Sequence, residues 1–429
     1  MIKINTNPSF ISEKNYIFDF IFSKILGLRF TLEFTYSELY SFHFDKNSFS
    51  FPDIFFSKIY QKKSNLEFHK YSFENKDFLK NNLIPEKNFL TFLQKHKSKP
   101  VKINGPNLTF HFDLIGTCFF LLSRYEETNP GTTDKHKRFS FRDSVAYKLG
   151  FADRPLVDEY VEFLWNLIKS NNPSLERKSK QFSYHVSHDI DRPVYKLNKV
   201  TNKKEYLLSN FENILETEKK FKIKSTFFFM SQVTERQIDV GYSIHASQIK
   251  KIFRLIHDSG SQIGLHGSYH SYNDSEQIKK EFCILRNACS ELGIKQEQWS
   301  SRQHYLRFDV NHTHSALDVA GVDYDCTLGF PDQPSFRSGT CHPHPVFDFE
   351  QRKTLKIISL PLIVMDVSLF NPRYLGFDLE SQEILNYVQT FIDKCRKYNG
   401  TFSLLYHDNY LAKEEHLNFY EKILATVSS

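Results

Sequence analysis

Short β-favouring runs alternate with helical stretches from residue 181 to the end of this chain, and no other feature restricts its fold as strongly. The expected strands lie at 184–187, 225–230, 262–265, 298–304, 324–328, 357–367 and 401–406. The expected helices lie at 204–221, 247–258, 275–292, 313–319, 379–398 and 414–427. Such alternation is typical of parallel strands joined by helices, so we predict an α/β fold with a barrel of the (β/α) type.

A separate N-terminal domain is expected before this region. The segment 171–178 is polar, charge-dense and contains a proline, which is typical of a domain junction. We therefore predict a smaller mixed α/β domain at 1–172 and the barrel at 181–429. Within the first domain, helices are expected from Asp113 to residue 127 and from Pro155 to residue 168, where apolar residues recur with helical spacing. The sequence does not indicate the role of this domain.

The chemically active side chains of the second half lie at the C-terminal ends of the expected strands. They are Asp189, Asp191, His266, Arg302, Asp325 and His407. In a parallel barrel these strand ends converge on one face, where catalytic loops gather. We therefore expect these six side chains to share one site.

A carboxylate and two imidazoles form a possible metal site. Asp191, His266 and His270 offer one oxygen and two nitrogens, a set that suits Zn²⁺ or a similar divalent ion (Co²⁺, Ni²⁺ or Mn²⁺). His266 and His270 are four residues apart and would share one face of a helical turn. The alternative is that both are ordinary structural imidazoles.

The remaining groups suit proton transfer. Asp189, held ionised by Arg302, is the candidate general base, although the sequence leaves open which of Asp189 and Asp191 is base and which is ligand. A protonated His407 would donate to the leaving group, with Asp408 or Asp325 fixing its tautomer. The alternative roles are a turn or cap for Asp189 and a structural imidazole for His407.

Two arginines are candidate substrate-binding residues. Arg337 lies in the segment 336–345, which we expect to form an ordered loop beside the site, and its guanidinium would clamp an anionic or polyhydroxyl substrate. Arg307 is the second candidate. An exposed structural loop is the alternative for 336–345.

Composition narrows the functional classes. The net charge is +6, and lysines are scattered among glutamates without a basic block, so no nucleic-acid partner is expected, although weak attraction to anionic lipid or acidic glycan is allowed. The six cysteines are dispersed and are expected to be reduced. The N-terminus lacks the layout of an export signal and no segment is expected to span the membrane. We expect a cytoplasmic protein, with peripheral membrane association allowed.

Five motifs in order resemble the polysaccharide deacetylase family (NodB homology, carbohydrate esterase family 4). They are 188–191 (HDID), 266–270 (HGSYH), 302–305 (RQHY), 323–325 (DYD) and 405–407 (LYH). The resemblance covers about residues 181–429. The N-terminal half resembles an uncharacterised domain often fused to such deacetylases, at 123–127 and 153–160.

The resemblance implies a distorted (β/α)₇ barrel that removes an N- or O-acetyl group from a sugar in bacterial surface-polysaccharide synthesis. It implies Asp189 as base, Asp191, His266 and His270 as metal ligands, and His407 as acid. Tyr305 would supply a backbone N–H to the oxyanion, and Arg302 and Asp325 would brace the base and its neighbours. Two departures are the residue between the two aspartates and a histidine, His304, where the third motif usually has proline. The lack of an export signal favours an intracellular acetylated sugar or glycan precursor.

Other functions remain open at this point. One is an amidohydrolase acting on a small non-sugar amide with the same barrel. Another is a catalytically inert carbohydrate-binding or scaffold protein, which the intact set of site residues disfavours. A non-haem iron oxygenase would also use two histidines and a carboxylate, but it needs a β-rich scaffold that the strand–helix alternation does not offer.

Overall fold

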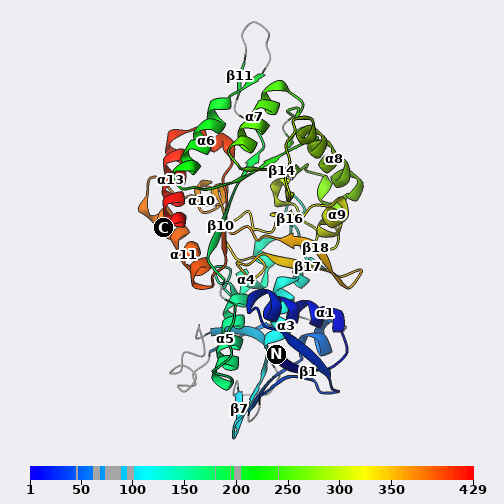
Figure 1. Ribbon diagram of the computed structural model, residues 1–429. Coiled ribbons are helices and arrows are strands. Elements are labelled where there is room, and N and C mark those ends of the chain that lie inside the picture. The colour runs from blue at the N-terminus through cyan, green and yellow to red at the C-terminus, as the bar shows by residue number, and fades with distance from the viewer. Residues whose placement is uncertain are drawn as a thin grey trace.

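The computed structural model describes residues 1–44, 47–60, 68–72, 88–93, 101–178, 180–193, 195–197, 204–239 and 241–429. Figure 1 shows the N-terminal half of the chain at one end of the molecule and the C-terminal half at the other. The two halves have largely separate hydrophobic cores. The domain boundaries at 1–172 and 181–429 remain our proposal.

The C-terminal half is built on a curled sheet of nine strands, most of them parallel. In spatial order they are β17 (His344–Asp348), β18 (Lys353–Ser359), β16 (Tyr324–Asp325), β15 (Ser300–Gln303), β14 (Gln262–Gly267), β13 (Thr226–Phe229), β10 (Ser183–Ile190), β20 (Thr401–Leu405) and β19 (Val364–Met365). Among the described strands of this sheet, β17 and β18 form the antiparallel pair. The sheet is open between its two edge strands, as in a half-barrel, so the prediction of a distorted β/α barrel is confirmed.

Helices cover the outside of this sheet (Figure 1). They are α6 (Leu208–Lys220), α7 (Ser247–Asp258), α8 (Ser275–Glu291), α9 (Thr313–Ala320), α11 (Gln382–Lys397) and α13 (Glu414–Ser428). Each helix packs an apolar face on the sheet. In α7 this face consists of residues at helical spacing that are all buried, namely Ile249, Ile252, Phe253 and Ile256. Helix α8 begins where the Asp274 side chain accepts a hydrogen bond from the Gln277 N–H at 3.0 Å.

Two differences from the expected strands have local causes. The single run expected at 357–367 is split into β18 and β19, because Pro361 lies between them and has no N–H for a strand ladder. Strand β17 was not predicted, and it forms a hairpin with β18 across the turn at 349–352. The helix expected from residue 204 begins at Leu208, since 204–206 form the short strand β12 (Lys204–Tyr206).

The described residues of the N-terminal half form two sheets and three main helices. One sheet has the order β2 (Phe30–Phe34), β1 (Ile2–Thr6), β3 (Leu39–His43), β4 (Ser48–Pro52), β8 (Asn107–Phe110), β7 (Val101–Asn104). The other has the order β5 (Phe68–Ser72), β6 (Asn88–Leu93), β9 (Phe112–Asp113). The helices are α1 (Ile11–Phe18), α3 (Leu114–Leu122) and α5 (Leu156–Asn171). Asp113 caps α3 as expected, accepting from the Gly116 N–H at 2.7 Å.

The two halves are joined by buried contacts. Phe330 and Phe347 of the second half belong to the hydrophobic core of the first. The Tyr16 hydroxyl of α1 donates a hydrogen bond to the Pro345 carbonyl at 2.9 Å. The N-terminal half is therefore packed on the segment that contains β17, close to one edge of the barrel sheet.

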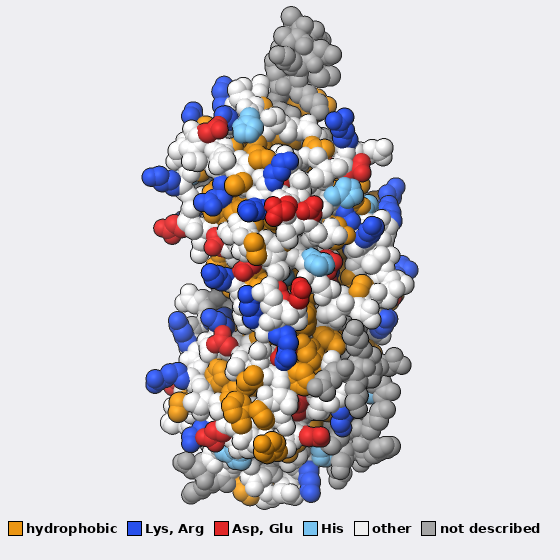
Figure 2. All heavy atoms as spheres, turned by 90° about the vertical axis from the view of Figure 1, so that its right-hand side faces the viewer, with side chains coloured by type: hydrophobic (Ala, Val, Ile, Leu, Met, Phe, Trp, Pro, Cys, Tyr) orange, Lys and Arg blue, Asp and Glu red, His pale blue; other side chains and the backbone are white. Residues whose placement is uncertain are grey.

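The surface carries mixed charge. On the face that Figure 2 shows, lysine and arginine side chains are interspersed with aspartate and glutamate, and exposed hydrophobic side chains gather over the N-terminal half. Phe34 and Tyr36 are among the large hydrophobic side chains that are exposed. Among the described residues, no helix combines the length and apolar character needed to cross a membrane.

Candidate active site

A buried ion pair fixes the first carboxylate of the site. Asp189, near the end of β10, is buried, and its Oδ1 accepts a hydrogen bond from Nη1 of Arg302 at 2.8 Å. Arg302 is fully buried on β15 and also donates to the Cys326 carbonyl and to the Ser187 hydroxyl, each at 2.9 Å. These contacts hold Asp189 in one orientation beside the positive charge of the Arg302 guanidinium.

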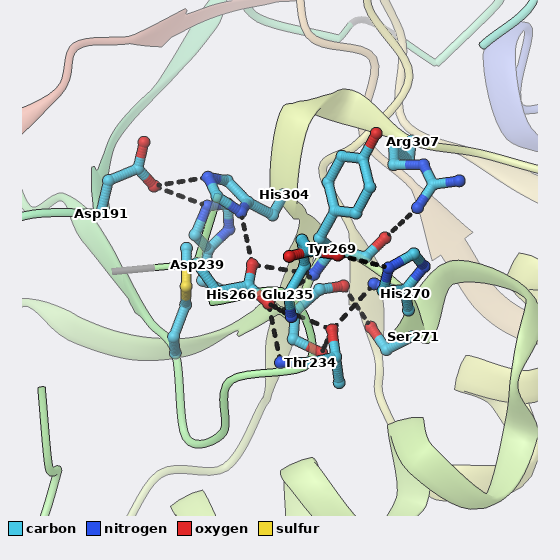
Figure 3. Close-up of polar contacts among 12 residues, drawn as sticks. Asp191, Thr234, Glu235, Asp239, His266, Tyr269, His270, Ser271, His304 and Arg307 are labelled. Carbon is cyan, nitrogen blue, oxygen red and sulfur yellow. Dashed lines mark hydrogen bonds and ion pairs between the residues drawn. The ribbon is translucent and has the colours of Figure 1, made fainter. Parts of the chain in front are cut away.

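Asp191, His266 and His304 form a compact group of metal-ligating side chains. One donor atom of each lies within 4.8 Å of the others. Asp191 Oδ1 is 3.0 Å from Nε2 of His266 and 3.5 Å from Nε2 of His304 (Figure 3). Asp189 Oδ2 is 3.8 Å from the same His266 nitrogen. The first carboxylate therefore adjoins the group without belonging to it.

The two imidazoles of this group are oriented by hydrogen bonds at their other nitrogen. His266 Nδ1 donates to the Arg302 carbonyl at 2.9 Å, which leaves Nε2 facing Asp191. His304 Nδ1 donates to Asp239 Oδ1 at 2.9 Å, again leaving Nε2 toward Asp191. Carbonyl and carboxylate partners of this kind are typical of imidazoles that bind a metal. The donor set of one oxygen and two nitrogens fits a divalent ion.

The pKa values of Asp191 and His304 are shifted by the charges of their neighbours. Burial raises the pKa of Asp191, but the imidazoles of His304 and His266 outweigh it and hold that pKa well below its usual range. Burial lowers the pKa of His304, whereas Asp191 and Asp239 raise it more strongly, to about 9. The attraction between Asp191 and His304 therefore shifts the pKa of each toward its charged form.

The structure does not bring His270 into this group. Its side chain is exposed, and its Nε2 lies 3.5 Å from Glu235 Oε2 (Figure 3). Strand β14 ends at Gly267 and a turn follows, so His266 and His270 do not share a helical face. Figure 3 shows His270 directed away from Asp191. The geometry therefore favours His304 over His270 as the third ligand.

His407 faces the group from the end of β20. Its Nδ1 donates to Asp366 Oδ1 at 2.8 Å, and its backbone N–H donates to Asp366 Oδ2 at 2.8 Å. Its Nε2 lies 3.8 Å from Asp191 Oδ2. Burial lowers the pKa of His407, but Asp366 outweighs burial and raises it to about 10. The imidazole is therefore protonated at neutral pH.

The partner of His407 is not one of the two aspartates that the sequence suggested. Asp325 is fully buried and accepts hydrogen bonds from the Thr327 hydroxyl at 2.6 Å and from His314 Nε2 at 3.0 Å. It also does not line the cavity described below. Asp408 follows His407 in sequence, but Asp366 occupies the Nδ1 side of the ring.

A cavity of about 600 Å³ opens over these residues. Asp189, Asp191, His304, Tyr305 and His407 all line it. The backbone of Tyr305 is left-handed, with φ of 60°, and its carbonyl accepts a hydrogen bond from Arg138 Nη1 at 2.8 Å. The expected role of the Tyr305 N–H at an oxyanion stays a prediction.

Arg337 and Arg307 do not line this cavity. Arg337 is buried and pairs with Glu127 of the N-terminal half, through bonds of 3.0 and 2.7 Å. Arg307 lies between the rings of Tyr269 and Tyr272, with its guanidinium carbon 4.0 Å from each ring centre. Both arginines therefore hold parts of the protein together, and the prediction that they bind substrate is not supported by their positions.

The segment 336–345 packs against α5 and is not a wall of the cavity. Asp158 of α5 accepts hydrogen bonds from the Thr340 hydroxyl at 2.6 Å and from the Cys341 N–H at 2.8 Å. Asp158, Cys341 and His342 form a second buried group of possible metal-ligating side chains. Within this group, Asp158 accepts from the Cys341 N–H and thiol, and these contacts join α5 to the segment 336–345.

Three site residues were missed by sequence reasoning. His304 was noted only as a departure from a motif, although it follows a strand end. Asp239 lies in a loop without a strand or helix pattern, so the sequence carried no signal for it. Asp366 directly follows the apolar run that ends in β19, and that position was the available signal.

Comparison with known proteins finds one family model in each half of the chain. Residues 204–319 match the polysaccharide deacetylase family. The C-terminal part of the chain contains a polysaccharide deacetylase domain. Residues 2–173 match a family of unknown function, DUF7033. No curated protein matches the sequence.

Several solved structures are similar to part of this chain. A Mycobacterium smegmatis protein assigned as a polysaccharide deacetylase is 16% identical, with a TM-score of 0.41 over 59% of this chain and 85% of that one. A family 4 carbohydrate esterase from Streptomyces lividans, in complex with acetate, is 11% identical, with a TM-score of 0.32 over 58% and 89%. A family 4 pseudoenzyme from Bacillus anthracis is 10% identical, with a TM-score of 0.32 over 58% and 61%.

Proposed function

We propose that this protein is a metal-dependent deacetylase that hydrolyses an N- or O-acetyl group of a sugar. One observation carries the proposal. A proton acceptor, Asp189, and a proton donor, His407, line one cavity beside one group of metal-ligating side chains. The polysaccharide deacetylase domain supports hydrolysis of an acetyl group as the reaction class.

Asp191, His266 and His304 are the residues that would hold the metal. Their donor atoms and the hydrogen bonds that orient the imidazoles fit Zn²⁺, and Co²⁺, Ni²⁺ and Mn²⁺ accept similar ligands. A divalent ion bound there supplies Lewis-acid polarisation of the acetyl carbonyl.

Asp189 is the general base of this proposal. Arg302 fixes the carboxylate through Oδ1 and leaves Oδ2 on the side of His266, toward the metal-ligating group. In this position it accepts a proton from the water that attacks the acetyl carbon. Because Oδ1 of Asp189 is held by Arg302, Oδ2 is the oxygen that accepts this proton.

His407 is the general acid. Asp366 fixes the proton of Nδ1 and raises the pKa of the ring, so Nε2 also carries a proton at neutral pH. Because Nε2 faces Asp191 in the cavity, it donates its proton to the leaving atom, which is the amine nitrogen or the alcohol oxygen of the sugar. The acid therefore begins the reaction protonated. The backbone N–H of Tyr305 is the proposed donor to the oxyanion.

The substrate class is an acetylated sugar or glycan precursor of bacterial surface-polysaccharide synthesis. A cavity of about 600 Å³ is large enough for a sugar unit and part of its attachment.

Acetate release tests the proposal. The full chain is incubated with acetylated monosaccharides, sugar nucleotides and oligosaccharides, with and without a chelator. The expected result is release of acetate from at least one class, abolished by the chelator and restored by a divalent ion. A properly folded, metal-loaded protein that binds acetylated sugars and releases no acetate from any of them would instead be an inert carbohydrate-binding protein.

A further inference from the structure

A loop of the N-terminal half forms part of the wall of the catalytic cavity. Asp134, Lys135, His136 and Arg138 all line the cavity, although they belong to the region that matches a family of unknown function. The loop is folded around Asp134. Its carboxylate accepts hydrogen bonds from the His136 N–H at 2.8 Å, the Arg138 N–H at 3.0 Å and Arg138 Nε at 2.7 Å.

The same loop is fastened to the barrel residues that surround the metal-ligating group. Arg138 Nη1 donates to the Tyr305 carbonyl at 2.8 Å. In the other direction, Arg307 Nε donates to the His136 carbonyl at 2.9 Å. His136 also contacts the Tyr269 hydroxyl through Nδ1 at 3.0 Å, and its ring centre is 4.6 Å from that of Tyr305. Contacts in both directions make the loop a fixed part of the cavity.

The cavity contains unpaired positive charge. Lys135, Arg192 and Arg373 line it, their side chains are exposed, and none has an ion pair with any residue that the structure describes. These three cations come from the N-terminal loop, from the segment after β10 and from the segment after β19. Three separate parts of the chain thus bring positive charge to one cavity.

The acidic residues of the cavity do not cancel this charge. Asp134 is paired with Arg138, and Asp189 is paired with Arg302. Asp191 is engaged by the imidazoles of the metal-ligating group. Of the described acidic residues that line the cavity, Asp332 is left without an ion pair. Three free cations against one free carboxylate favour an anionic ligand.

We propose that the N-terminal half completes the substrate site and that Lys135, Arg192 and Arg373 bind an anionic group, phosphate or carboxylate, attached to the acetylated sugar. This inference rests on the proposed deacetylase function, because the cations flank the same metal-ligating group. Arginine and lysine together suit such a group, since the guanidinium binds two oxygens at once and the ammonium adds a movable point charge. A neutral polymer would leave all three cations without a partner.

Binding is measured by calorimetry with the full-length, metal-loaded Asp189→Asn variant, which prevents turnover. The ligands are an N-acetylhexosamine, its 1-phosphate and the corresponding N-acetylhexosaminuronic acid. We expect at least one of the two anionic ligands to bind about tenfold more tightly than the neutral sugar at low ionic strength. The difference should shrink in high salt, because exposed charges are screened. The comparison of phosphate with carboxylate identifies the anionic group.

Two lysine variants, one inside and one outside the cavity, test the role of the cavity charge. Lys135→Ala should weaken binding of the anionic ligand about two- to fivefold, the effect of one exposed ion pair, and leave the neutral sugar unchanged. Lys148→Ala removes the same charge from an exposed site of the N-terminal half outside the cavity and should have no effect. Equal affinity for neutral and anionic sugars, or equal effects of the two lysine variants, would overturn the inference. Acetate release from neutral sugars with charge-independent affinity would overturn it while leaving the proposed function intact.

Discussion

Asp366 controls the protonation state of the proposed general acid, and Asp366→Asn tests that control. In the wild type both oxygens of Asp366 accept hydrogen bonds from His407, and the pKa of His407 is raised to about 10 against the effect of burial. Asparagine has nearly the same shape but no charge. Since a neighbouring opposite charge moves a pKa by about 1–3 units, we expect the pKa of His407 to fall by that amount, or about 1.4–4 kcal/mol.

The sign follows from the direction of the pKa change. His407 acts as an acid only while protonated, so activity is lost as pH rises through its pKa. The alkaline limb of kcat/KM should therefore move to lower pH in Asp366→Asn by about 1–3 units. The same pairing stabilises the fold fully below the ordinary pKa of 6.5, and this contribution is lost as the pH rises toward about 10.

The assay is acetate release between pH 6 and 11, with unfolding followed in parallel. Asparagine cannot accept from both His407 donors with its single oxygen, so a loss of about 1–3 kcal/mol in stability is also expected. Asp258→Asn, an exposed change on α7, serves as the control for loss of one carboxylate. An alkaline limb at the same pH in Asp366→Asn and the wild type would refute the assignment of His407 as the acid governed by Asp366.

Two further substitutions test the base and the contact between the two halves. Asp189→Asn should lower kcat by about two to four decades while the metal content stays unchanged, and near-normal turnover would transfer the base role to another group. Glu127→Ala should lower the free energy of unfolding in urea by about 3–5 kcal/mol, because it leaves Arg337 buried without its partner. The control is Glu33→Ala, which breaks an exposed ion pair with Lys3 and should lower the free energy of unfolding by about 1 kcal/mol or less. Equal losses of unfolding free energy in the two variants would argue against a special role for the buried pair.

Much of the barrel could be predicted from the sequence because buried parallel strands have a simple signature. Apolar β-favouring runs between helical stretches located β10, β13, β14 and β20 within a few residues. Strand β17 was not predicted because it forms a hairpin at the sheet edge and does not follow the alternation of strand and helix. In the N-terminal half the helices α3 and α5 were predicted but the strands were not. Even the β3–β4 and β7–β8 hairpins escaped prediction, because strands of four or five residues are too short to show a clear alternating pattern.

The site was predictable where chemistry coincided with a strand end. Asp189, Asp191, Arg302 and His407 meet at the cavity or directly behind it, as their placement after strands indicated.

The geometry does not support the prediction for His270, because a turn follows His266 and the two imidazoles do not share a helical face. Asp366 and Asp239 act through tertiary contacts with imidazoles far away in sequence, which spacing does not encode. Arg337 illustrates the opposite case, in which a basic residue in a polar loop proved to be buried against Glu127.

Metal content per chain tests the central claim most directly. The wild type, His304→Ala and His270→Ala are purified, loaded with Zn²⁺, dialysed and measured by mass spectrometry of the metal. We predict about one ion per chain in the wild type and in His270→Ala, and loss of the ion in His304→Ala, since the latter removes one of three donors. Retention of the ion in His304→Ala together with its loss in His270→Ala would contradict the site described for this protein.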